Sequence, residues 1–197
     1  MAATIDAILL AAGNSSRMGR PKQALPVEGL PLLVRTIRVL KNSGTLRNIV
    51  VVTGAGAESL TPLIAEEAVS VIENNQWLSG MGSSLKSGLD FLLRQTPVAD
   101  GVLVSVCDQP FLSVDVIRAI ANHAAMHPLI ASNYGEVLGP PSFFGREFFM
   151  ELMELPDEGG ARTLFNRYPH RVTKVPFPDG AIDLDTPEDY ERYLNRT

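Results

Sequence analysis

A run of small residues followed by two cations stands near the amino terminus. The apolar stretch that ends at Leu10 is followed by small side chains as far as Ser16, and then by Arg17 and Lys22. Small side chains let backbone N–H groups turn inward on a bound anion, which the two cations could neutralise. We therefore interpret residues 8–26 as the end of a strand and a loop that holds phosphate groups. A purely structural turn is the alternative, but it would not need both cations.

Two later stretches of the sequence are typical of extended chain. One aspartate comes directly after the first stretch, and two aspartates lie within the second. Asp108 comes directly after the apolar run 101–107, and Pro110 then forces the chain to turn. Carboxylates at the tip of a central strand suit hard cations, so Asp108 is our first candidate metal ligand. Asp183 and Asp185 alternate along a short extended segment and therefore lie on one face, where two like charges usually require a cation.

A second loop, residues 74–84, leaves a predicted strand and opens a predicted helix. Gly80 lies within it, and Ser83 and Ser84 fall where the N–H groups of a helix start are unpaired. Such groups could hold a base edge or a phosphate. The alternative is a serine cap with Trp77 filling the core, and the two interpretations are compatible.

The first loop is neither a P-loop nor a dinucleotide-binding loop, because both spacings of glycine are absent. Its pattern A-A-G-x-S-x-R-M-G-x-P-K resembles the signature of nucleotidyltransferases with the glycosyltransferase-A-like fold. Within that superfamily, the string LLAAGNSSRMGRPKQALP is similar to the MobA-like enzymes that attach a nucleotide to the molybdenum cofactor, the cytidylyltransferases in particular. The resemblance extends from residue 5 to residue 190.

The resemblance implies a Mg²⁺-dependent attack of an anionic phosphate, that of molybdopterin, on the α-phosphorus of CTP, with release of pyrophosphate. The D-Q-P triplet at Asp108 resembles the magnesium-binding position of the family, and I-D-L-D-T-P-E-D resembles its closing acidic segment, so one of Asp183 and Asp185 should share the metal. The catalytic residues would be Lys22, Arg17 and Asp108. The nucleotide-binding residues would be Leu10, Ala11, Ala12, Gly13, Ser15, Arg17, Lys22, Gly80, Ser83 and Ser84.

A glycine-rich segment near residue 160 is the expected acceptor site. The Gly-Gly-Ala-Arg core of residues 159–162 resembles a family motif, in which Gly160 and Arg162 would contact the acceptor. A guanidinium group near a helix start could grip a phosphate bidentately, although a surface arginine is an equal alternative. Family members more often carry His where this chain has Pro140, and that departure leaves the acceptor in question.

Three other functions fit the same residues. The first two keep the fold and change a substrate: a guanylyltransferase for the same cofactor, or a cytidylyltransferase acting on a sugar or polyol phosphate. The string from Ala11 to Gly13 resembles the cytidylyl branch. The third is a carrier that delivers the cofactor to a molybdoenzyme partner, but a carrier would not need Lys22 or a divalent metal.

Composition limits the class of protein. The 197 residues fit one nucleotidyltransferase domain, with a nucleotide-binding half over about 1–112 and an acceptor-binding half over about 113–197. A net charge of −5 without a basic tract argues against nucleic-acid binding, and no apolar run is long enough for a membrane span. The single cysteine, Cys107, and the absence of a signal-peptide pattern predict a cytoplasmic protein.

Alternating strand and helix patterns predict an α/β fold. We expect a single-domain three-layer αβα arrangement around a mostly parallel, mixed sheet, with the ligand at the carboxyl ends of the strands. Thr186 and Asp189 fit the cap and capping-box acid of a last helix. The predicted strands are 5–10, 48–53, 69–73, 101–107 and 129–133, and the region 133–144 should be a bent crossing. The predicted helices are 31–42, 58–68, 85–94, 113–125, 145–155 and 162–168.

Overall fold

A seven-stranded mixed sheet forms the middle of the molecule in the computed structural model, which describes residues 3–196. Its strand order is β5-β4-β1-β6-β8-β7-β9, and β8 runs antiparallel to both of its neighbours while the other pairings are parallel. The strands are β1 (Ile5–Leu10), β4 (Leu46–Thr53), β5 (Ser70–Glu73), β6 (Gly101–Val106), β7 (Leu129–Asn133), β8 (Leu138–Gly145) and β9 (Thr173–Pro176), with a separate two-stranded pair β2 (Pro26–Val27) and β3 (Leu30–Pro31).

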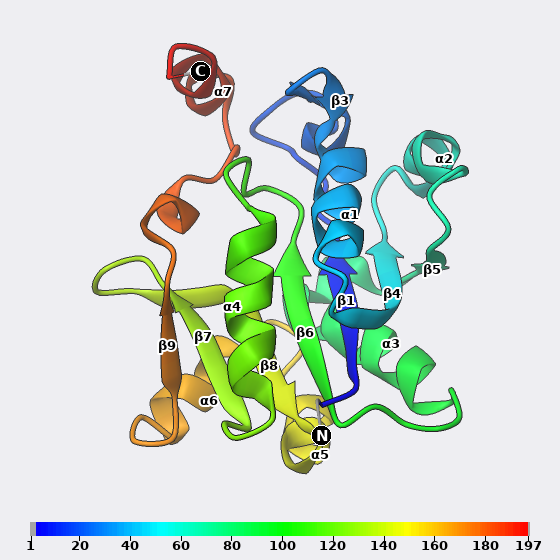
Figure 1. The fold of residues 1–197 in the computed structure, drawn as a ribbon. Helices are drawn as coiled ribbons and strands as arrows, with labels where there is room; N and C mark the ends of the chain where they lie inside the picture. The colour runs from blue at the N-terminus through cyan, green and yellow to red at the C-terminus, as the bar shows by residue number, and fades with distance from the viewer. Residues whose placement is uncertain (1–2, 197) are drawn as a thin grey trace.

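Helices cover both faces of the sheet, as predicted (Figure 1). On one face, α1 and α4 pack on alternate residues of the strands; on the other face, α3, α5 and α6 pack on the residues between them. The helices are α1 (Leu32–Asn42), α2 (Ala57–Leu60), α3 (Met81–Leu93), α4 (Val114–Ala124), α5 (Phe149–Met153), α6 (Arg162–Arg167) and α7 (Pro187–Leu194). The predicted three-layer αβα fold with a mostly parallel sheet is confirmed.

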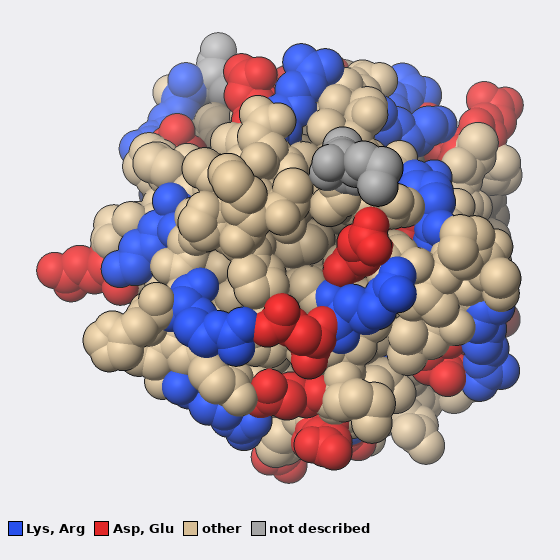
Figure 2. Space-filling view, turned by 60° about the horizontal axis from the view of Figure 1, so that its bottom comes forward, with Lys and Arg blue, Asp and Glu red and all other residues tan. Residues whose placement is uncertain are grey.

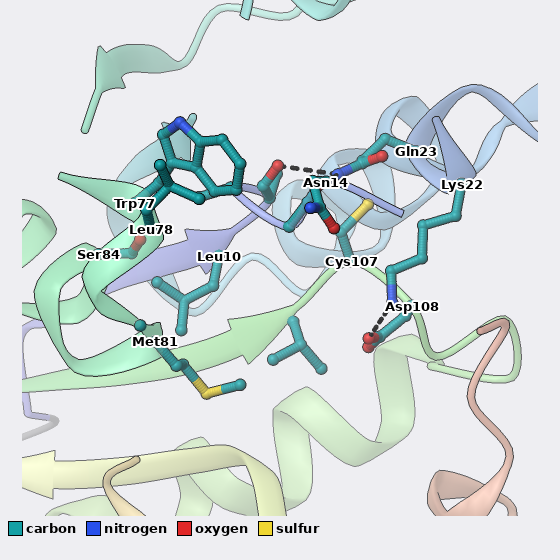
Figure 3. A pocket seen from close by; sticks show the side chains of 15 residues that line it. Leu10, Asn14, Lys22, Gln23, Trp77, Leu78, Met81, Ser84, Cys107 and Asp108 are labelled. Carbon is teal, nitrogen blue, oxygen red and sulfur yellow. Dashed lines mark hydrogen bonds and ion pairs between the residues drawn. The ribbon is translucent and has the colours of Figure 1, made fainter. Parts of the chain in front are cut away.

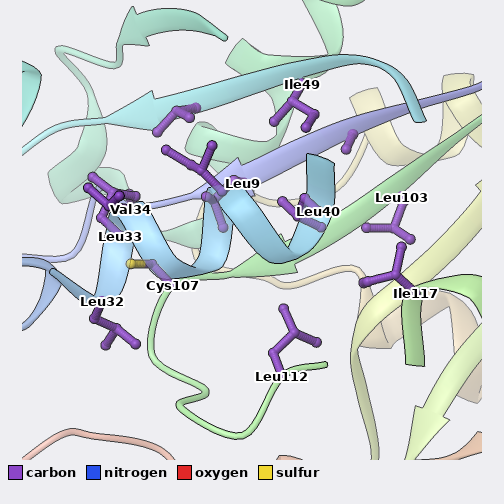
Figure 4. Packing of buried hydrophobic residues seen from close by; sticks show 14 of the residues in the cluster. Leu9, Leu32, Leu33, Val34, Leu40, Ile49, Leu103, Cys107, Leu112 and Ile117 are labelled. Atoms are coloured by element: carbon purple, nitrogen blue, oxygen red, sulfur yellow. The ribbon is translucent and has the colours of Figure 1, made fainter. Parts of the chain in front are cut away.

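Strand β1 explains this layering. It is buried along its whole length and pairs in parallel with β4 on one side and β6 on the other. Because side chains alternate along a strand, Leu9 enters the core under α1 while Ile8 enters the core under α3. Figure 4 shows Leu9 packed among leucines of α1. Because β1 pairs with β4 on one side and with β6 on the other, its register in the sheet fixes where the following loop begins.

Several predicted boundaries are wrong. The helix expected over 58–68 ends at Leu60 and becomes the 3₁₀ helix η2 (Thr61–Ile64), because Pro62 has no N–H to donate to the preceding turn. The helix expected over 145–155 is divided into the 3₁₀ helix η4 (Arg146–Phe148) and α5. The bent crossing expected over 133–144 is instead a turn followed by β8, which carries Pro140 and Pro141 within the sheet.

The carboxyl ends of β1, β4 and β6 meet at one edge of the sheet, because the three strands are parallel neighbours. The loops that leave Leu10, Thr53 and Val106 therefore lie together, at the top of Figure 1. At the opposite end, Figure 2 shows basic and acidic side chains interspersed. Ion pairs such as Arg146 with Asp100 lie there, next to the amino end of β6. Within residues 3–196, no helix is long and apolar enough to cross a membrane.

Replacing Gly101 with alanine should destabilise the fold. A Cβ atom at Gly101 would lie 2.2 Å from Cζ of Phe143, which is only 1% exposed and so has little room to move. Overpacking of this kind costs about 1–3 kcal/mol, which should appear as a lower free energy of unfolding in urea titrations.

Gly160→Ala is the matched control, because its Cβ would make an ordinary contact of 3.7 Å with Sδ of Met81. We expect it to change the free energy of unfolding by no more than about 0.5 kcal/mol. A Gly101→Ala variant as stable as the control would contradict the close packing of β8 on β6.

Candidate functional site

The loop after β1 is held in shape by one buried glutamine. Gln23 is 1% exposed, and its Nε2 atom donates to the carbonyl oxygens of Ala11 and Gly13, both at 2.9 Å. Its Oε1 atom accepts from the Ser15 hydroxyl at 3.2 Å, and that hydroxyl accepts from the Lys22 backbone N–H at 3.0 Å. The sequence analysis missed Gln23. Its position one residue after Lys22, in a loop whose carbonyls need donors, was the available signal.

Lys22 connects this loop to two distant acids. Its Nζ atom donates to Oδ2 of Asp108 and to Oδ1 of Asp185, both at 2.7 Å. Arg17 donates to the other oxygen of Asp185 at 2.8 Å. The Lys22 side chain is 13% exposed, that of Asp108 23% and that of Asp185 33%, whereas Arg17 is 69% exposed. Asp108 and Asp185 lie 86 and 163 positions after Lys22 in the chain, and they meet at its ammonium group.

The charges at this cluster shift each other's pKa values. Burial alone would lower the pKa of Lys22, but the two carboxylates outweigh it and raise that pKa. Burial would likewise raise the pKa of Asp185, but Lys22 and Arg17 hold it below its usual value. Asp183 behaves differently: partial burial, followed by repulsion from Asp108 and Asp185, raises its pKa to about 7. Because Asp183 keeps an exposed surface, solvent screens part of this repulsion.

Carboxylate oxygen is in excess here, which suits a hard divalent cation. Asp108, Asp183 and Asp185 outnumber the buried ammonium, and Oδ1 of Asp108 is buried with no hydrogen-bond partner among residues 3–196. As the side chains stand, no group of three or more His, Cys, Asp or Glu residues in this part of the chain is arranged to hold a metal ion. Lys22 bonds to Oδ2 of Asp108 and to Oδ1 of Asp185, so a metal bound through those two oxygens would have to displace its ammonium, whereas Oδ1 of Asp108 is not bonded to it.

A cavity of about 450 Å³ lies over the first loop. Figure 3 shows Lys22 and Asp108 at one side of it and Trp77 at the other. The lining includes the predicted residues Leu10, Ala11, Ala12, Gly13, Lys22, Gly80, Ser84 and Asp108, and it leaves out Ser15, Arg17 and Ser83. Lys22 and Asp108, which come from different parts of the chain, therefore border one cavity.

The lining also includes residues that the sequence analysis did not assign to the site. Asn14 and Met81 lie along it, and Trp77 is half-buried in its wall rather than filling the core. The thiol of Cys107 also borders the cavity but is 3% exposed, and burial raises its pKa, so it is protonated at neutral pH.

The second loop differs from the prediction in one respect. Helix α3 begins at Met81 rather than at residue 85, so Ser83 and Ser84 lie inside its first turn and neither is the cap. The residue at the cap position is Gly80, whose φ of 122° disfavours other residue types. The buried side chain of Asn74 donates to the hydroxyls of Ser83 and Ser84 at 2.9 and 3.0 Å. These two serines therefore help to fix the loop, and Ser84 also borders the cavity.

The same loop packs directly on the predicted acceptor segment. The N–H of Gly82 donates to the carbonyl of Asp157 at 2.8 Å, and a Cβ at Gly82 would lie 2.3 Å from the carbonyl oxygen of Pro156. Lys86 of α3 pairs with the Asp157 carboxylate and donates to the carbonyl of Leu155 at 3.0 Å. Glycine at position 82 is therefore needed for the close approach of the two segments.

A second, more apolar cavity of about 430 Å³ adjoins the first. The two share Leu10, Met81 and Val106 in their linings, and the second cavity also contains Gly160, Arg162, Pro140, Tyr134 and Asp183. Arg162 is exposed at the start of the six-residue helix α6. The geometry thus brings Gly160 and Arg162 to a cavity beside the first one, on the side where Asp183 lies.

The predicted capping of the last helix is confirmed. Thr186 and Asp189 form a reciprocal capping box at the start of α7, with hydrogen bonds of 2.8 and 3.2 Å. The N–H of Leu184 donates to the carbonyl of Asp108 at 2.9 Å. This bond holds the acidic segment beside the end of β6. Both Asp183 and Asp185 interact electrostatically within the same cluster, and which of them shares a metal with Asp108 stays a prediction.

Comparison with known proteins gives one family and several full-length relatives. The model of the MobA-like NTP transferase domain matches residues 7–172. The chain is 29% identical to a Paenarthrobacter nicotinovorans protein named nicotine blue oxidoreductase, covering 96% of each chain. It is 28% identical to the molybdenum cofactor cytidylyltransferase of Escherichia coli K12, covering 96% of this chain and 97% of the relative. It is 26% identical to a Rhodobacter capsulatus molybdenum cofactor guanylyltransferase, covering 98% and 96%.

Solved structures share the fold. A manganese complex of a Mycobacterium tuberculosis H37Rv protein has a TM-score of 0.79 and is 27% identical to this chain. The match covers 99% of this chain and 100% of the other. A nucleotidyl transferase from Methanothermobacter thermautotroptrophicus has a TM-score of 0.83, covering 98% and 97%; at 24% identity it supports the fold alone.

Replacing Lys22 with methionine should strengthen the binding of Mn²⁺ to the nucleotide-free protein. A metal that takes the oxygens of Asp108 and Asp185 must break charge-assisted bonds to Lys22, each worth about 1.5–3 kcal/mol. Without them, we expect Mn²⁺ to bind about tenfold more tightly, as measured by the loss of the free-ion electron paramagnetic resonance signal during titration.

The matched control is Lys41→Met, because Lys41 pairs with Glu67 and not with the site. This control should bind Mn²⁺ as the wild type does. Weaker Mn²⁺ binding by Lys22→Met than by the control would show that the ammonium does not compete with a cation.

Replacing Asp183 with asparagine should change the dependence of stability on pH. Since the pKa of Asp183 rises from 3.8 to about 7 on folding, the folded protein holds a proton there that the unfolded chain has lost. The contribution of this group to stability therefore falls as the pH rises from about 4 to about 7. In urea titrations with a chelator present, the free energy of unfolding of Asp183→Asn should rise relative to that of the wild type over this pH range. Above that range the difference between the two should stay constant.

Asp185→Asn is the contrasting variant, because the pKa of Asp185 is lowered on folding. Its loss of stability relative to the wild type should be greatest at neutral pH and should shrink as the pH falls. A stability difference between Asp183→Asn and the wild type that does not vary with pH would rule out the raised pKa.

Proposed function

We propose a specific transfer reaction for this chain, which belongs to the family of MobA-like NTP transferase domains and is an enzyme of the nucleotidyltransferase type. The donor is CTP, the acceptor is the phosphate of a molybdopterin-type cofactor, and pyrophosphate is released with Mg²⁺ as the metal. The observation that carries the proposal is the Lys22 ammonium, 2.7 Å from both Asp108 and Asp185 at the border of the 450 Å³ cavity.

The residues in and around the first cavity have complementary tasks in this reaction. The N–H of Ala11 donates to the carbonyl of Val52, so the backbone N–H groups offered to the phosphates are those of Ala12 and Gly13. Lys22 and Arg17 neutralise the charge of the phosphates. Asp108, with Asp183 or Asp185, would hold the divalent ion, which supplies further charge neutralisation when bound. The cavity wall made by Trp77 and Leu78 would enclose the rest of the nucleotide.

The second cavity is the proposed acceptor site. Its apolar lining shields one side of the reaction from water, and Arg162 and Gly160 lie where an anionic group of the acceptor would enter. An attacking phosphate is already deprotonated at neutral pH, so the reaction requires no general base. Catalysis then depends on holding two substrates in line across the border that the cavities share at Leu10, Met81 and Val106.

The choice of CTP is supported by the string from Ala11 to Gly13, which resembles the cytidylyl branch. The relatives include both a cytidylyltransferase and a guanylyltransferase, so GTP is the competing donor. We further propose a cytoplasmic protein that passes its product to a molybdoenzyme partner, with the buried thiol of Cys107 suited to a reducing compartment. A sugar or polyol phosphate is the competing acceptor.

The test is to incubate the protein with Mg²⁺, the molybdenum cofactor and each of the four ribonucleoside triphosphates in turn. We expect pyrophosphate release and a cytidylylated product, identified by mass spectrometry, with CTP. Asp108→Asn and Lys22→Met should each lose about a hundredfold or more in turnover, the scale for losing an electrostatic contact in the transition state.

Asp90→Asn is the matched control, because Asp90 is an exposed acid of α3 that pairs with Arg94. It should turn over as the wild type does. Faster reaction with GTP would move the assignment to a guanylyltransferase, and cofactor binding without pyrophosphate release would favour a carrier. Because one relative is named an oxidoreductase, consumption of a nicotinamide cofactor in place of pyrophosphate release would overturn the proposal.

A further inference from the structure

A buried glutamine and a tyrosine join three segments beside the site. Gln109, which follows Asp108, is 2% exposed. Its Nε2 atom donates to Oη of Tyr134 and to the carbonyl of Gly180, both at 2.8 Å. The Tyr134 hydroxyl in turn donates to the carbonyl of Pro140. Gly180 offers only a carbonyl acceptor, so the amide nitrogen of Gln109 must face it, and the orientation of the amide is fixed by chemistry.

The ring of Tyr134 occupies a slot that only glycine neighbours allow. A Cβ at Gly139 would lie 2.8 Å from Oη of Tyr134, and a Cβ at Gly180 would lie 2.3 Å from its Cε1. The ring of Phe177 meets that of Tyr134 edge-on, with centroids 5.9 Å apart. The hydroxyl of Tyr134 can therefore reach Gln109 only because two of its neighbours have no side chain.

Burial of the Gln109 amide costs free energy, because one of its two polar atoms lacks a partner. Its Oε1 atom is buried with no hydrogen-bond partner in the part of the chain that the structure describes. Buried polar atoms are nearly always paired, so an unpaired one needs an explanation. The explanation that the contacts offer lies at the other end of the same amide, where one nitrogen serves two segments.

One of those segments carries the acids of the site. Gly180 begins the stretch that leads to Asp183 and Asp185, and the N–H of Leu184 donates to the carbonyl of Asp108 at 2.9 Å. Residues 108 and 109 thus hold this stretch at two points, four residues apart. Asp183 lies between these two points, and Asp185 lies just beyond the second. Asp183 is close enough to Asp108 to be repelled by its charge, and Asp185 shares the Lys22 ammonium with Asp108.

The other segment forms a wall of the second cavity. Tyr134, Gly139 and Pro140 all line it, together with Asp183. Resting on the proposed function, we propose that Gln109 and Tyr134 are positioning residues for nucleotidyl transfer: their hydrogen bonds hold the wall of the acceptor cavity in register with the acidic segment of the metal and nucleotide site. Neither residue contacts a reacting atom; each acts through the backbone that it holds.

Tyr134→Phe tests the link to the acceptor, because it removes one hydroxyl and keeps the ring. The carbonyl of Pro140 loses its donor, so the cavity wall should be less well placed. We expect the KM for the acceptor to rise about tenfold while the KM for the nucleotide stays within about twofold, as measured in pyrophosphate-release kinetics. A purely structural role would instead lower the amount of folded enzyme and leave both KM values unchanged.

The matched control is Tyr168→Phe, in which a tyrosine loses hydrogen bonds to Glu151 away from both cavities. Its two KM values should match those of the wild type. An unchanged acceptor KM for Tyr134→Phe, or an equal rise in both KM values, would overturn the proposal.

Gln109→Met tests the link to the acidic segment by a readout that does not depend on turnover. Methionine keeps the length of the side chain and removes both donated hydrogen bonds. We expect amide hydrogen exchange in a peptide spanning residues 178–186 to become about tenfold faster, while peptides of α5 exchange as in the wild type. Unchanged exchange in 178–186 would overturn the proposal.

The two experiments also separate this inference from the proposed function. A wild-type protein that released no pyrophosphate with any donor would end the proposed function, and the exchange measurement would still decide whether Gln109 holds the acidic segment. Slower transfer by Gln109→Met with unaltered exchange would retain the function and reject the positioning role.

Discussion

The sharing of one ammonium group by two carboxylates is the interaction on which the site depends. Lys22 lies on the loop after β1, Asp108 lies at the end of β6, and Asp185 lies just before α7, so three parts of the chain must be placed correctly for it to form. The three charged groups are partly buried, and an unpaired charge in that position would lose solvation without compensation. Each charge is therefore stabilised by the other two. The fold supplies this placement through the parallel pairing of β1 with β6 and the bond from Leu184 to Asp108.

Hydrogen bonds from buried amides hold the loops around that cluster. Gln23 fixes the first loop through two carbonyls, Asn74 fixes the second through two hydroxyls, and Gln109 joins the acidic segment to the wall of the second cavity. An amide can donate twice from one nitrogen without adding charge, which suits a region already crowded with acids. The charged residues of the site can therefore face the cavity while neutral ones carry the structural contacts.

The sequence predicted the layered fold and most of the first cavity because both depend on local patterns. Buried strands such as β1 are continuous apolar runs, and the small residues from Ala11 to Gly13 identify the loop by composition alone. Gln109 and Tyr134 could not be found in this way, since Gln109 bonds to Tyr134 and to Gly180, which lie 25 and 71 positions away in the chain. The end of α2 was mispredicted: Pro62 lies within the predicted range, and a proline lacks the N–H that continues the hydrogen bonds of an α-helix.

The contact between Gly82 and the carbonyl of Pro156 has a consequence for how such proteins could be recombined. A chimera that joined residues 1–112 of this chain to the remainder of a relative would bring together two surfaces that were never fitted to each other. The missing Cβ of Gly82 lets this close contact form only if the partner segment follows the same path, so residues 80–82 and 156–160 would have to come from the same parent. The boundary between the two cavities is therefore not a boundary along the chain.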